Sequence, residues 1–253
     1  MIKKSLYLIL AIVLILPMVV IFYLSLVNHW SYPNIFEVHI SWSLWAEFFS
    51  GNNNIFKSVF LSLFLSTIIA STATIFGFLV SQQLYEKPLF FKLAYFPYLI
   101  APVVFGAMLQ FYFTLIGLTG SFWGVLLAQI LFVFPYSVLL FSTFWDERVR
   151  QTAFQSTTLG ANTWEVFRTV LLPMSKPWIF LCFVQCFLIS WYEYGITQLI
   201  GIGKIETLPI KTMLFIKEAN PHLAALSACI MVFPIISFLL LNRQLFLKKE
   251  VTA

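Results

Sequence analysis

An acidic side chain lies deep in an apolar run at Glu193, within the sequence SWYEYG of residues 190–195. A carboxylate in hydrocarbon is costly unless it faces a wet cavity, pairs with another group or takes up a proton. Glu193, with Tyr194, Gln198 and Gln110 from an earlier apolar segment, could therefore line a translocation path for a cationic or hydroxyl-rich solute. The alternative is a structural hydrogen-bond anchor between helices or between subunits, and the sequence leaves both roles open.

A second candidate for function is the polar stretch of residues 146–177, which separates two strongly apolar blocks. It cannot cross a bilayer, because its charged side chains would each cost several kcal/mol in hydrocarbon. We predict two short helices within it, over residues 148–158 and 162–171, joined by a break at Leu159-Gly160-Ala161. This helix–glycine–helix segment, residues 149–171, is called the elbow below.

The limits of the second helix of the elbow follow from individual side chains. Asn162 or Thr163 would cap its start, because the side-chain oxygen can accept a hydrogen bond from a free backbone N–H. Pro173 and Pro177 should stop the helix before the next apolar run. Gly160 permits the break, where a side chain would strain or clash. The sequence therefore predicts a pair of short helices held on one side of a membrane.

Composition places the chain among integral membrane proteins. Hydrophobic residues make up 60% of its 253 residues and charged residues only 10%, which excludes a soluble domain of ordinary composition. The net charge of +5 does not indicate nucleic-acid binding, because the basic residues lie beside apolar segments. Cys182, Cys186 and Cys229 all lie inside apolar runs and are expected to be small packing residues, without a disulfide or metal site.

We predict an all-α, polytopic membrane protein with six transmembrane helices. They cover residues 6–27, 55–82, 91–116, 122–144, 178–200 and 223–245, so the elbow falls between the fourth and the fifth. Pro97 and Pro102 should kink the third helix. Residues 41–49 should form a short amphipathic helix on the outer surface, and residues 201–222 an outer loop.

The basic residues predict the orientation of these helices. With both termini in the cytoplasm, eleven lie inside: Lys3, Lys4, Lys87, Lys92, Arg148, Arg150, Arg168, Lys176, Arg243, Lys248 and Lys249. Four lie outside: Lys57, Lys204, Lys211 and Lys217. Short loops rich in Lys and Arg stay in the cytoplasm. This excess therefore predicts that both termini and the elbow are cytoplasmic.

The elbow resembles the signature of a known family. Gly160, Val170, Leu172 and Pro173 occur at the spacing G-x9-[IV]-x-L-P. This resembles the cytoplasmic loop EAA-x3-G-x9-I-x-LP of permease subunits of binding-protein-dependent ABC importers, whose paired coupling helices sit in a groove of the ATP-binding subunit. The residues expected to contact that subunit are Phe154, Gln155, Ser156, Leu159, Gly160, Ala161, Trp164, Phe167, Val170, Leu172 and Pro173. Because the first three replace E-A-A, the acidic contact of the family is absent.

The stretch around Glu193 extends the resemblance. Residues 190–197 follow S-W-x-E-[YF]-G-x-T and precede Gly201 to Gly203 and Thr207-Leu208-Pro209, which is similar to permeases for iron, thiamine, polyamines and phosphonates. The resemblance implies a multi-pass protein of the bacterial inner membrane, surrounded by lipid. A permease core of residues 55–245 would follow an N-terminal helix and outer loop (residues 1–54), and residues 246–253 would form a cytoplasmic tail.

The resemblance also implies partners. The pore would be shared with a second permease subunit, and an extracytoplasmic solute-binding protein would deliver the solute. This chain would bind no cofactor, because ATP and Mg²⁺ would be held by separate cytoplasmic ATPase subunits. The altered E-A-A positions favour a second permease subunit that differs from this one.

Two other functions remain open. A self-contained secondary transporter or channel would use Glu193 as its ion or proton site, but a proton relay needs a second titratable group and none lies inside another predicted span. A non-transporting membrane scaffold would explain the apolar helices, but the spacing of residues within the elbow would then be a coincidence. Catalysis by this chain is not expected, because the sequence has no G-x4-G-K-[ST], H-E-x-x-H or C-x-x-C motif.

Overall fold

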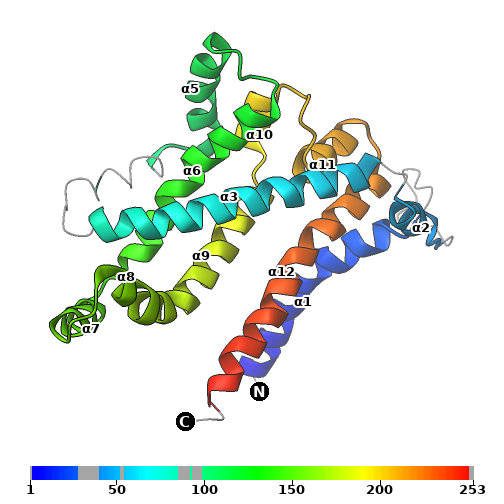
Figure 1. Cartoon of the computed structure of the whole chain (residues 1–253). Coiled ribbons are helices and arrows are strands. Elements are labelled where there is room, and N and C mark those ends of the chain that lie inside the picture. The colour runs from blue at the N-terminus through cyan, green and yellow to red at the C-terminus, as the bar shows by residue number, and fades with distance from the viewer. Residues whose placement is uncertain (1, 28–39, 52–53, 85–91, 93–98, 251–253) are drawn as a thin grey trace. The chain divides into compact units, whose positions relative to one another are not determined.

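The computed structural model describes residues 2–27, 40–51, 54–84, 92 and 99–250, and these are almost entirely helical (Figure 1). The helices are α1 (Ile2–Leu24), α2 (Ser43–Phe49), α3 (Asn54–Leu84), α5 (Pro102–Leu115), α6 (Phe122–Ser142), α7 (Glu147–Thr158), α8 (Thr163–Val166), the π-helix η2 (Phe167–Leu171), α9 (Leu172–Trp191), α10 (Gly195–Gly201), α11 (Leu208–Lys217) and α12 (Pro221–Glu250). Among the described residues the β pairing consists of one isolated bridge, between Val27 and Ile40. The predicted all-α class is confirmed.

In the part of the chain that the structure describes, four helical stretches are long and apolar enough to cross a membrane. They are Asn54–Leu84, Phe122–Ser142, Thr163–Trp191 and Pro221–Leu240, and they overlap the second, fourth, fifth and sixth predicted spans. Shorter apolar helical stretches lie at Ile15–Leu24 and Pro102–Leu115, within the first and third predicted spans. The chain is therefore a multi-pass membrane protein by the length and composition of its helices.

Contacts divide the chain into two compact units. The first unit joins Met1–Ser62 to Glu206–Ala253, and in it α12 packs against α1, α2 and α11. The hydroxyl of Ser62 accepts a hydrogen bond of 2.7 Å from the backbone N–H of Leu208, which joins the start of α3 to the start of α11. Helices from both ends of the sequence thus form one packed group.

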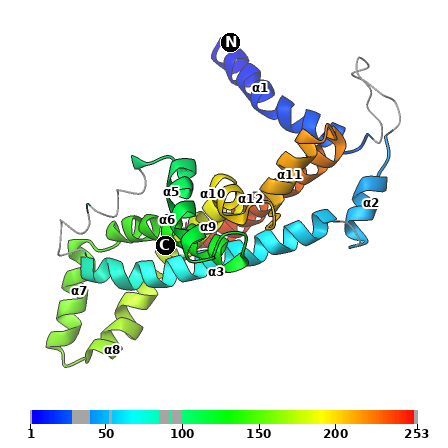
Figure 2. The ribbon, with the colours of Figure 1, turned by 90° about the horizontal axis from the view of Figure 1, so that it is seen from above.

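The second unit, Leu63–Ile205, carries both candidate sites. In it α10 packs against α5 and α6, and α6 packs against α9 (Figure 1). The elbow projects as a helical hairpin made of α7 and α8, which continues through η2 into α9 (Figure 2).

The third predicted span differs from the structure at its start. α5 begins at Pro102, which occupies the first turn of the helix. Proline has no backbone N–H, and an N–H in the first turn would have no partner within the helix, so Pro102 starts the helix and does not kink it. Residues 93–98, including Pro97, lie outside the described residues.

The expectation that Pro173 and Pro177 end the helix of the elbow is wrong. One helical stretch runs from Thr163 to Trp191. Within it, the backbone N–H of Leu172 bonds to the carbonyl of Phe167, five residues earlier. In an α-helix the ring of Pro173 would clash with the carbonyl four residues before it. The wider π turn of Phe167–Leu171, which ends two residues before the proline, offers more room for this ring.

The fifth predicted span is interrupted, and the outer loop is partly helical. Residues 178–200 were expected to form one helix, but α9 ends at Trp191 and α10 starts at Gly195. Within predicted loop 201–222 the structure has α11, which begins with a proline in its first turn. The short helix predicted at residues 41–49 is confirmed as α2.

Candidate functional site

The hairpin of the elbow is fixed by caps at the start of each helix. The carboxylate of Asp146 accepts a 2.9 Å hydrogen bond from the N–H of Val149 at the start of α7. At the start of α8, the side chain of Asn162 accepts from the N–H of Glu165, and the Glu165 carboxylate accepts from the N–H of Asn162, each at 2.9 Å. Such a reciprocal capping box satisfies two backbone donors at once. The cap predicted at Asn162 is confirmed.

Gly160 makes the turn between these two helices. Its φ angle is +93°, a left-handed conformation that side chains rarely adopt, and open space surrounds the position of a Cβ atom. The constraint at Gly160 is therefore its backbone conformation and not a neighbouring atom. Ala161 follows it and donates its N–H to the carbonyl of Ser156, which closes the turn at 3.1 Å.

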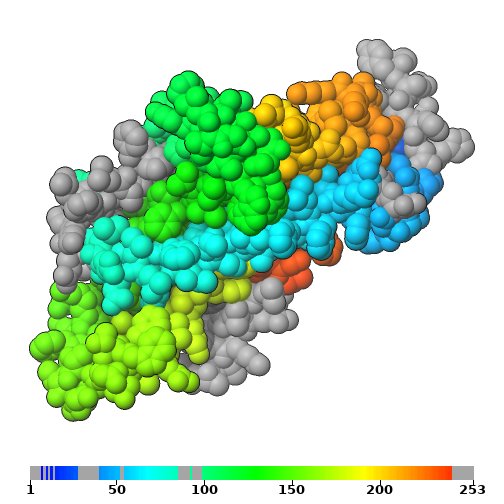
Figure 3. Space-filling view, turned by 45° about the horizontal axis from the view of Figure 1, so that its top comes forward, coloured from blue at the N-terminus to red at the C-terminus, as the bar shows by residue number. Residues whose placement is uncertain are grey.

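Three large apolar side chains of the elbow are exposed. The exposed fractions are 69% for Phe154, 88% for Leu159 and 67% for Trp164. They lie on a segment that is otherwise rich in polar side chains, and Figure 3 shows the elbow, in yellow-green, as a projecting surface next to α3. Gln155 is also exposed, and half-buried Ser156 donates its hydroxyl to the Thr152 carbonyl. Several large exposed apolar side chains on one short segment are typical of a protein contact.

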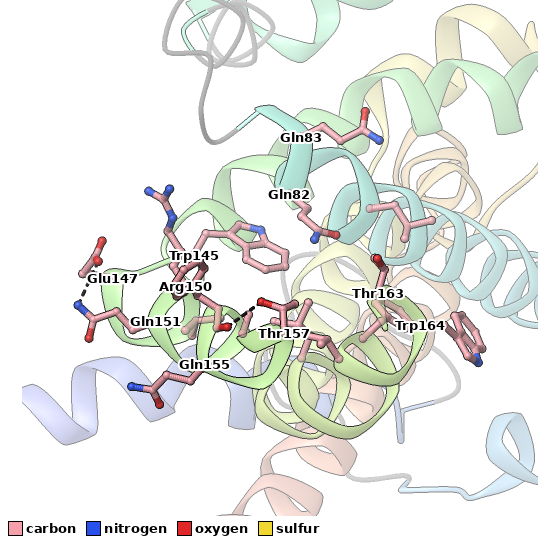
Figure 4. A pocket seen from close by; sticks show the side chains of 17 residues that line it. Gln82, Gln83, Trp145, Glu147, Arg150, Gln151, Gln155, Thr157, Thr163 and Trp164 are labelled. Carbon is pink, nitrogen blue, oxygen red and sulfur yellow. Dashed lines mark hydrogen bonds between the residues drawn. The ribbon is translucent and has the colours of Figure 1, made fainter. Parts of the chain in front are cut away.

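A hollow of about 1230 Å³ lies between the elbow and the C-terminal end of α3 (Figure 4). Gln82 and Gln83 line it from α3, and Trp145 lines it from the segment between α6 and α7. The elbow contributes residues of α7, α8 and η2, among them Phe154 and Trp164.

Aromatic rings connect the surface of the elbow to the spans. The ring of Trp164 stacks on that of Phe167 with centroids 5.6 Å apart, and Phe167 lies 6.2 Å from Phe78 of α3. Phe78 in turn lies 5.2 Å from Phe141 of α6 and 5.4 Å from Trp145. These rings, with Phe144, are called the aromatic cluster below. A displacement of the elbow would meet this cluster directly.

The remaining positions of the predicted signature lie in the helix that leaves the elbow. Val170, in the π-helix, is half-buried, and Leu171 beside it is buried. Leu172 and Pro173 form the first turn of α9. The signature thus covers the point at which the elbow becomes a candidate span.

Glu193 lies in the interruption between α9 and α10. Only 8% of the residue is exposed. Its Oε1 accepts from the N–H of Ile196 at 2.6 Å, and its Oε2 accepts from the N–H and the hydroxyl of Thr197 at 2.9 and 2.6 Å. The carboxylate therefore binds the first turn of α10.

A buried amide extends this group to α6. The Nε2 atom of Gln129 donates to the Thr197 hydroxyl at 2.7 Å and approaches Oε2 of Glu193 at 3.4 Å. The Oε1 atom of Gln129 accepts from the Ser190 hydroxyl of α9 at 2.6 Å. Leaving one such buried donor or acceptor unpaired costs about 1–3 kcal/mol. Gln129, Ser190, Glu193 and Thr197 are called the polar network below.

The other residues predicted for the path take no part in the hydrogen bonds of this network. Tyr194, which directly precedes α10, and Gln198 on α10 are half-buried, and half-buried Gln110 lies on α5, which packs against α10. The role of these residues as a path stays a prediction. Sequence reasoning missed Gln129, whose single signal was a polar side chain inside an apolar span, and Phe78, which no local pattern distinguishes from other phenylalanines.

The chain is similar to membrane components of transport systems. Residues 87–249 match the family model described as "Binding-protein-dependent transport system inner membrane component". The chain is 28% identical over 201 residues to the spermidine/putrescine transport system permease protein PotC of Haemophilus influenzae, covering 76% of this chain and 77% of that protein. It is 30% identical over 183 residues to the molybdenum transport system permease protein ModB of the same organism, covering 64% and 79%.

A third relative comes from an alga. The chain is 30% identical over 194 residues to the probable sulfate transport system permease protein cysT of Chlorella vulgaris, covering 76% of this chain and 60% of that protein. These relatives are permease subunits, and in such systems ATP is hydrolysed by separate ATPase subunits. Family membership thus favours the importer over a self-contained transporter or a scaffold. The chain belongs to the family of inner membrane components of binding-protein-dependent transport systems, as a translocation subunit of an ABC importer.

Proposed function

We propose that the elbow is the surface through which cytoplasmic ATPase subunits drive this permease. The observation that carries the proposal is the exposure of three large apolar side chains, Phe154, Leu159 and Trp164, on a segment rich in polar side chains. The family resemblance expects an acidic contact at position 154, and here an exposed phenylalanine would make an apolar contact instead. Nearby, the hollow beside α3 would receive side chains of the ATPase.

The aromatic cluster would pass the movement to the spans. When the ATPases close on ATP, they would push on α7 and α8, and the Trp164–Phe167–Phe78 contacts would carry that push to α3 and α6. Packed rings transmit displacement because protein interiors have low compressibility. The spans would then rock between inward-open and outward-open forms.

The topology of the proposal has six spans, with both termini and the elbow in the cytoplasm. The excess of Lys and Arg on that side supports it. α1 and α5 would supply the two spans beyond the four long apolar helices. Tyr194, Gln198 and Gln110 would line the translocation path, and a second, different permease subunit would complete it.

A polyamine is the first solute that we propose. PotC, which is named for spermidine and putrescine, aligns over 201 residues, whereas the relatives named for molybdenum and sulfate align over 183 and 194. Uptake of radiolabelled spermidine into cells with and without this gene tests the proposal. Uptake of molybdate or sulfate that depends on the gene, without spermidine uptake, would assign a different solute.

Co-purification from mild detergent tests the role of the elbow. We expect the tagged chain to bring down an ATP-binding subunit and a second membrane chain, and Gly160→Trp to lose the ATP-binding subunit. Gly117→Trp is the matched control, because Gly117 has a φ of +70° and open space around its Cβ position, as Gly160 does at +93°. The proposal fails if Gly160→Trp retains the ATPase and transports normally.

A further inference from the structure

The backbone between α9 and α10 has to satisfy its own hydrogen bonds. α9 is part of a candidate span, Thr163–Trp191, and the chain stops being helical at residues 192–194 before α10 begins. The first N–H groups of any helix have no partner within that helix. In a membrane protein such groups must find a partner inside the protein, because lipid offers none.

Glu193 supplies that partner. The N–H groups of Ile196 and Thr197, in the first turn of α10, both donate to its carboxylate. The hydroxyl of Thr197 and the amide of Gln129 approach the same carboxylate. Two carboxylate oxygens offer about four acceptor sites, so the donors of this chain alone are enough to occupy the group. Little of its acceptor capacity is left for a solute.

The members of the polar network are shielded from solvent as well as paired. The exposed fractions are 1% for Gln129, 4% for Ser190, 8% for Glu193 and 0% for Thr197. Because these residues lie on α6, on α9, in the interruption and on α10, the network joins three helices at one point. The geometry of the network fixes where α10 starts and how α10 is oriented toward α6.

Close packing against α5 also holds α10. A Cβ atom at Gly195 would lie 2.8 Å from Cγ2 of Val103 on α5. A Cβ atom at Gly106 of α5 would lie 3.2 Å from the Cα atom of Ile196. These two glycines let α5 and α10 approach closely, as small residues do between membrane helices. α10 is therefore held both by this close approach to α5 and by the polar network.

We propose that Glu193 is a positioning residue, which caps α10 and ties it to α6 through Thr197 and Gln129, and that it is not a ligand of the transported solute. Through this cap Glu193 sets the place of Tyr194 and Gln198 on the path. That last step rests on the path proposed above, whereas the cap itself does not.

Hydrogen–deuterium exchange of the full chain, purified in its complex and held in lipid nanodiscs, tests the cap without knowledge of the solute. The variants are Glu193→Gln, whose amide presents a donor to one of the two backbone N–H groups, and Thr197→Val, which removes the buried hydroxyl at nearly constant volume. Thr197→Ser is the matched control, because it keeps the hydroxyl.

We expect the amides of Ile196 and Thr197 to exchange roughly tenfold faster in Glu193→Gln than in the wild type, as loss of a helix cap would produce. Thr197→Val keeps both backbone bonds to the carboxylate but removes the hydroxyl that joins it to Gln129, so these amides should also exchange faster because α10 is no longer tied to α6. α6 and α9 should exchange at wild-type rates, and Thr197→Ser should restore slow exchange in α10. Wild-type exchange in α10 for both variants would overturn the proposal. If Glu193→Gln does not assemble, the exchange rate of the α10 amides in Thr197→Val decides: faster exchange supports the proposal and wild-type exchange overturns it. The two proposals fail separately. Gly160→Trp tests whether the elbow binds the ATPase, and it should leave amide exchange in α10 unchanged.

Discussion

Replacing Phe78 by alanine should weaken the connection between the elbow and the spans. The side chain is 5% exposed, and its ring lies 5.2 Å from Phe141, 5.4 Å from Trp145, 6.0 Å from Phe144 and 6.2 Å from Phe167. Truncating a buried phenylalanine typically costs about 3–5 kcal/mol, because apolar contact is lost and a cavity remains. For a chain of this size, that cost corresponds to a fall of roughly 6–20 °C in the unfolding midpoint.

The matched control for this substitution lies two residues away on the same helix. Phe76 is 57% exposed, so Phe76→Ala removes the same atoms without opening a buried cavity. Thermal unfolding of both purified variants in the same detergent gives the stability difference, and ATP hydrolysis with and without solute-loaded binding protein gives the coupling. We expect Phe78→Ala to melt earlier and to hydrolyse ATP with little response to solute. Equal midpoints and equal coupling in the two variants would refute the role of the aromatic cluster.

Three further predictions follow from single contacts. Gly195→Ala places a Cβ atom 2.8 Å from Cγ2 of Val103, so this substitution should lower the unfolding midpoint. Adding Val103→Ala to the same chain should restore the midpoint. A midpoint unchanged by Gly195→Ala would argue against the close approach of α5 and α10. Asn162→Ala removes the cap of α8 and should cost about 1 kcal/mol, seen as faster amide exchange at Glu165, whereas unchanged exchange would refute the cap. Pro173→Ala removes the ring that favours the π turn, so the helix should close to an α turn and rotate the elbow by about 100° relative to α9. The ATPase should stay bound, but its ATP hydrolysis should respond less to solute. A normal response of ATP hydrolysis to solute would show that the π turn is dispensable.

Local signals in the sequence predicted the elbow well. Gly160 and Asn162 each have a local effect. Gly160 adopts a backbone conformation that favours glycine, and Asn162 caps a helix by bonding to the N–H three residues later. Both effects can be predicted from the sequence, because they depend on residues that are close together in it. The helix limits around them, Glu147–Thr158 and a start at Thr163, follow the predicted ranges closely.

The effect of the prolines was predicted wrongly because it depends on helix type. The rule that proline ends a helix assumes an α turn, in which the ring meets the carbonyl four residues earlier. A π-helix, Phe167–Leu171, ends two residues before Pro173, and the helix continues as α9. Nothing in the residues of the π turn, Phe167 to Leu171, marks this wider turn in advance.

The polar network and the aromatic cluster could not be predicted, because each depends on residues distant in the sequence. Gln129 and Glu193 are 64 residues apart, and Phe78 and Phe167 come from different helices. The sequence did identify Glu193 as unusual and left its two roles open. The hydrogen bonds of its carboxylate favour the anchor, because its acceptors face the donors of α10.

Photo-cross-linking from the elbow tests the coupling proposal most directly. Leu159 is 88% exposed and follows the last residue of α7, so a photoreactive phenylalanine at this position samples whatever covers the elbow in the cell. Ile116, 66% exposed next to the end of α5, is the control position. We predict one major adduct at position 159 with an ATP-binding subunit, and none with that subunit at position 116. Labelling of that subunit from position 116 but not from 159 would contradict the proposed coupling, as would the absence of any protein adduct at 159 in cells that carry out transport.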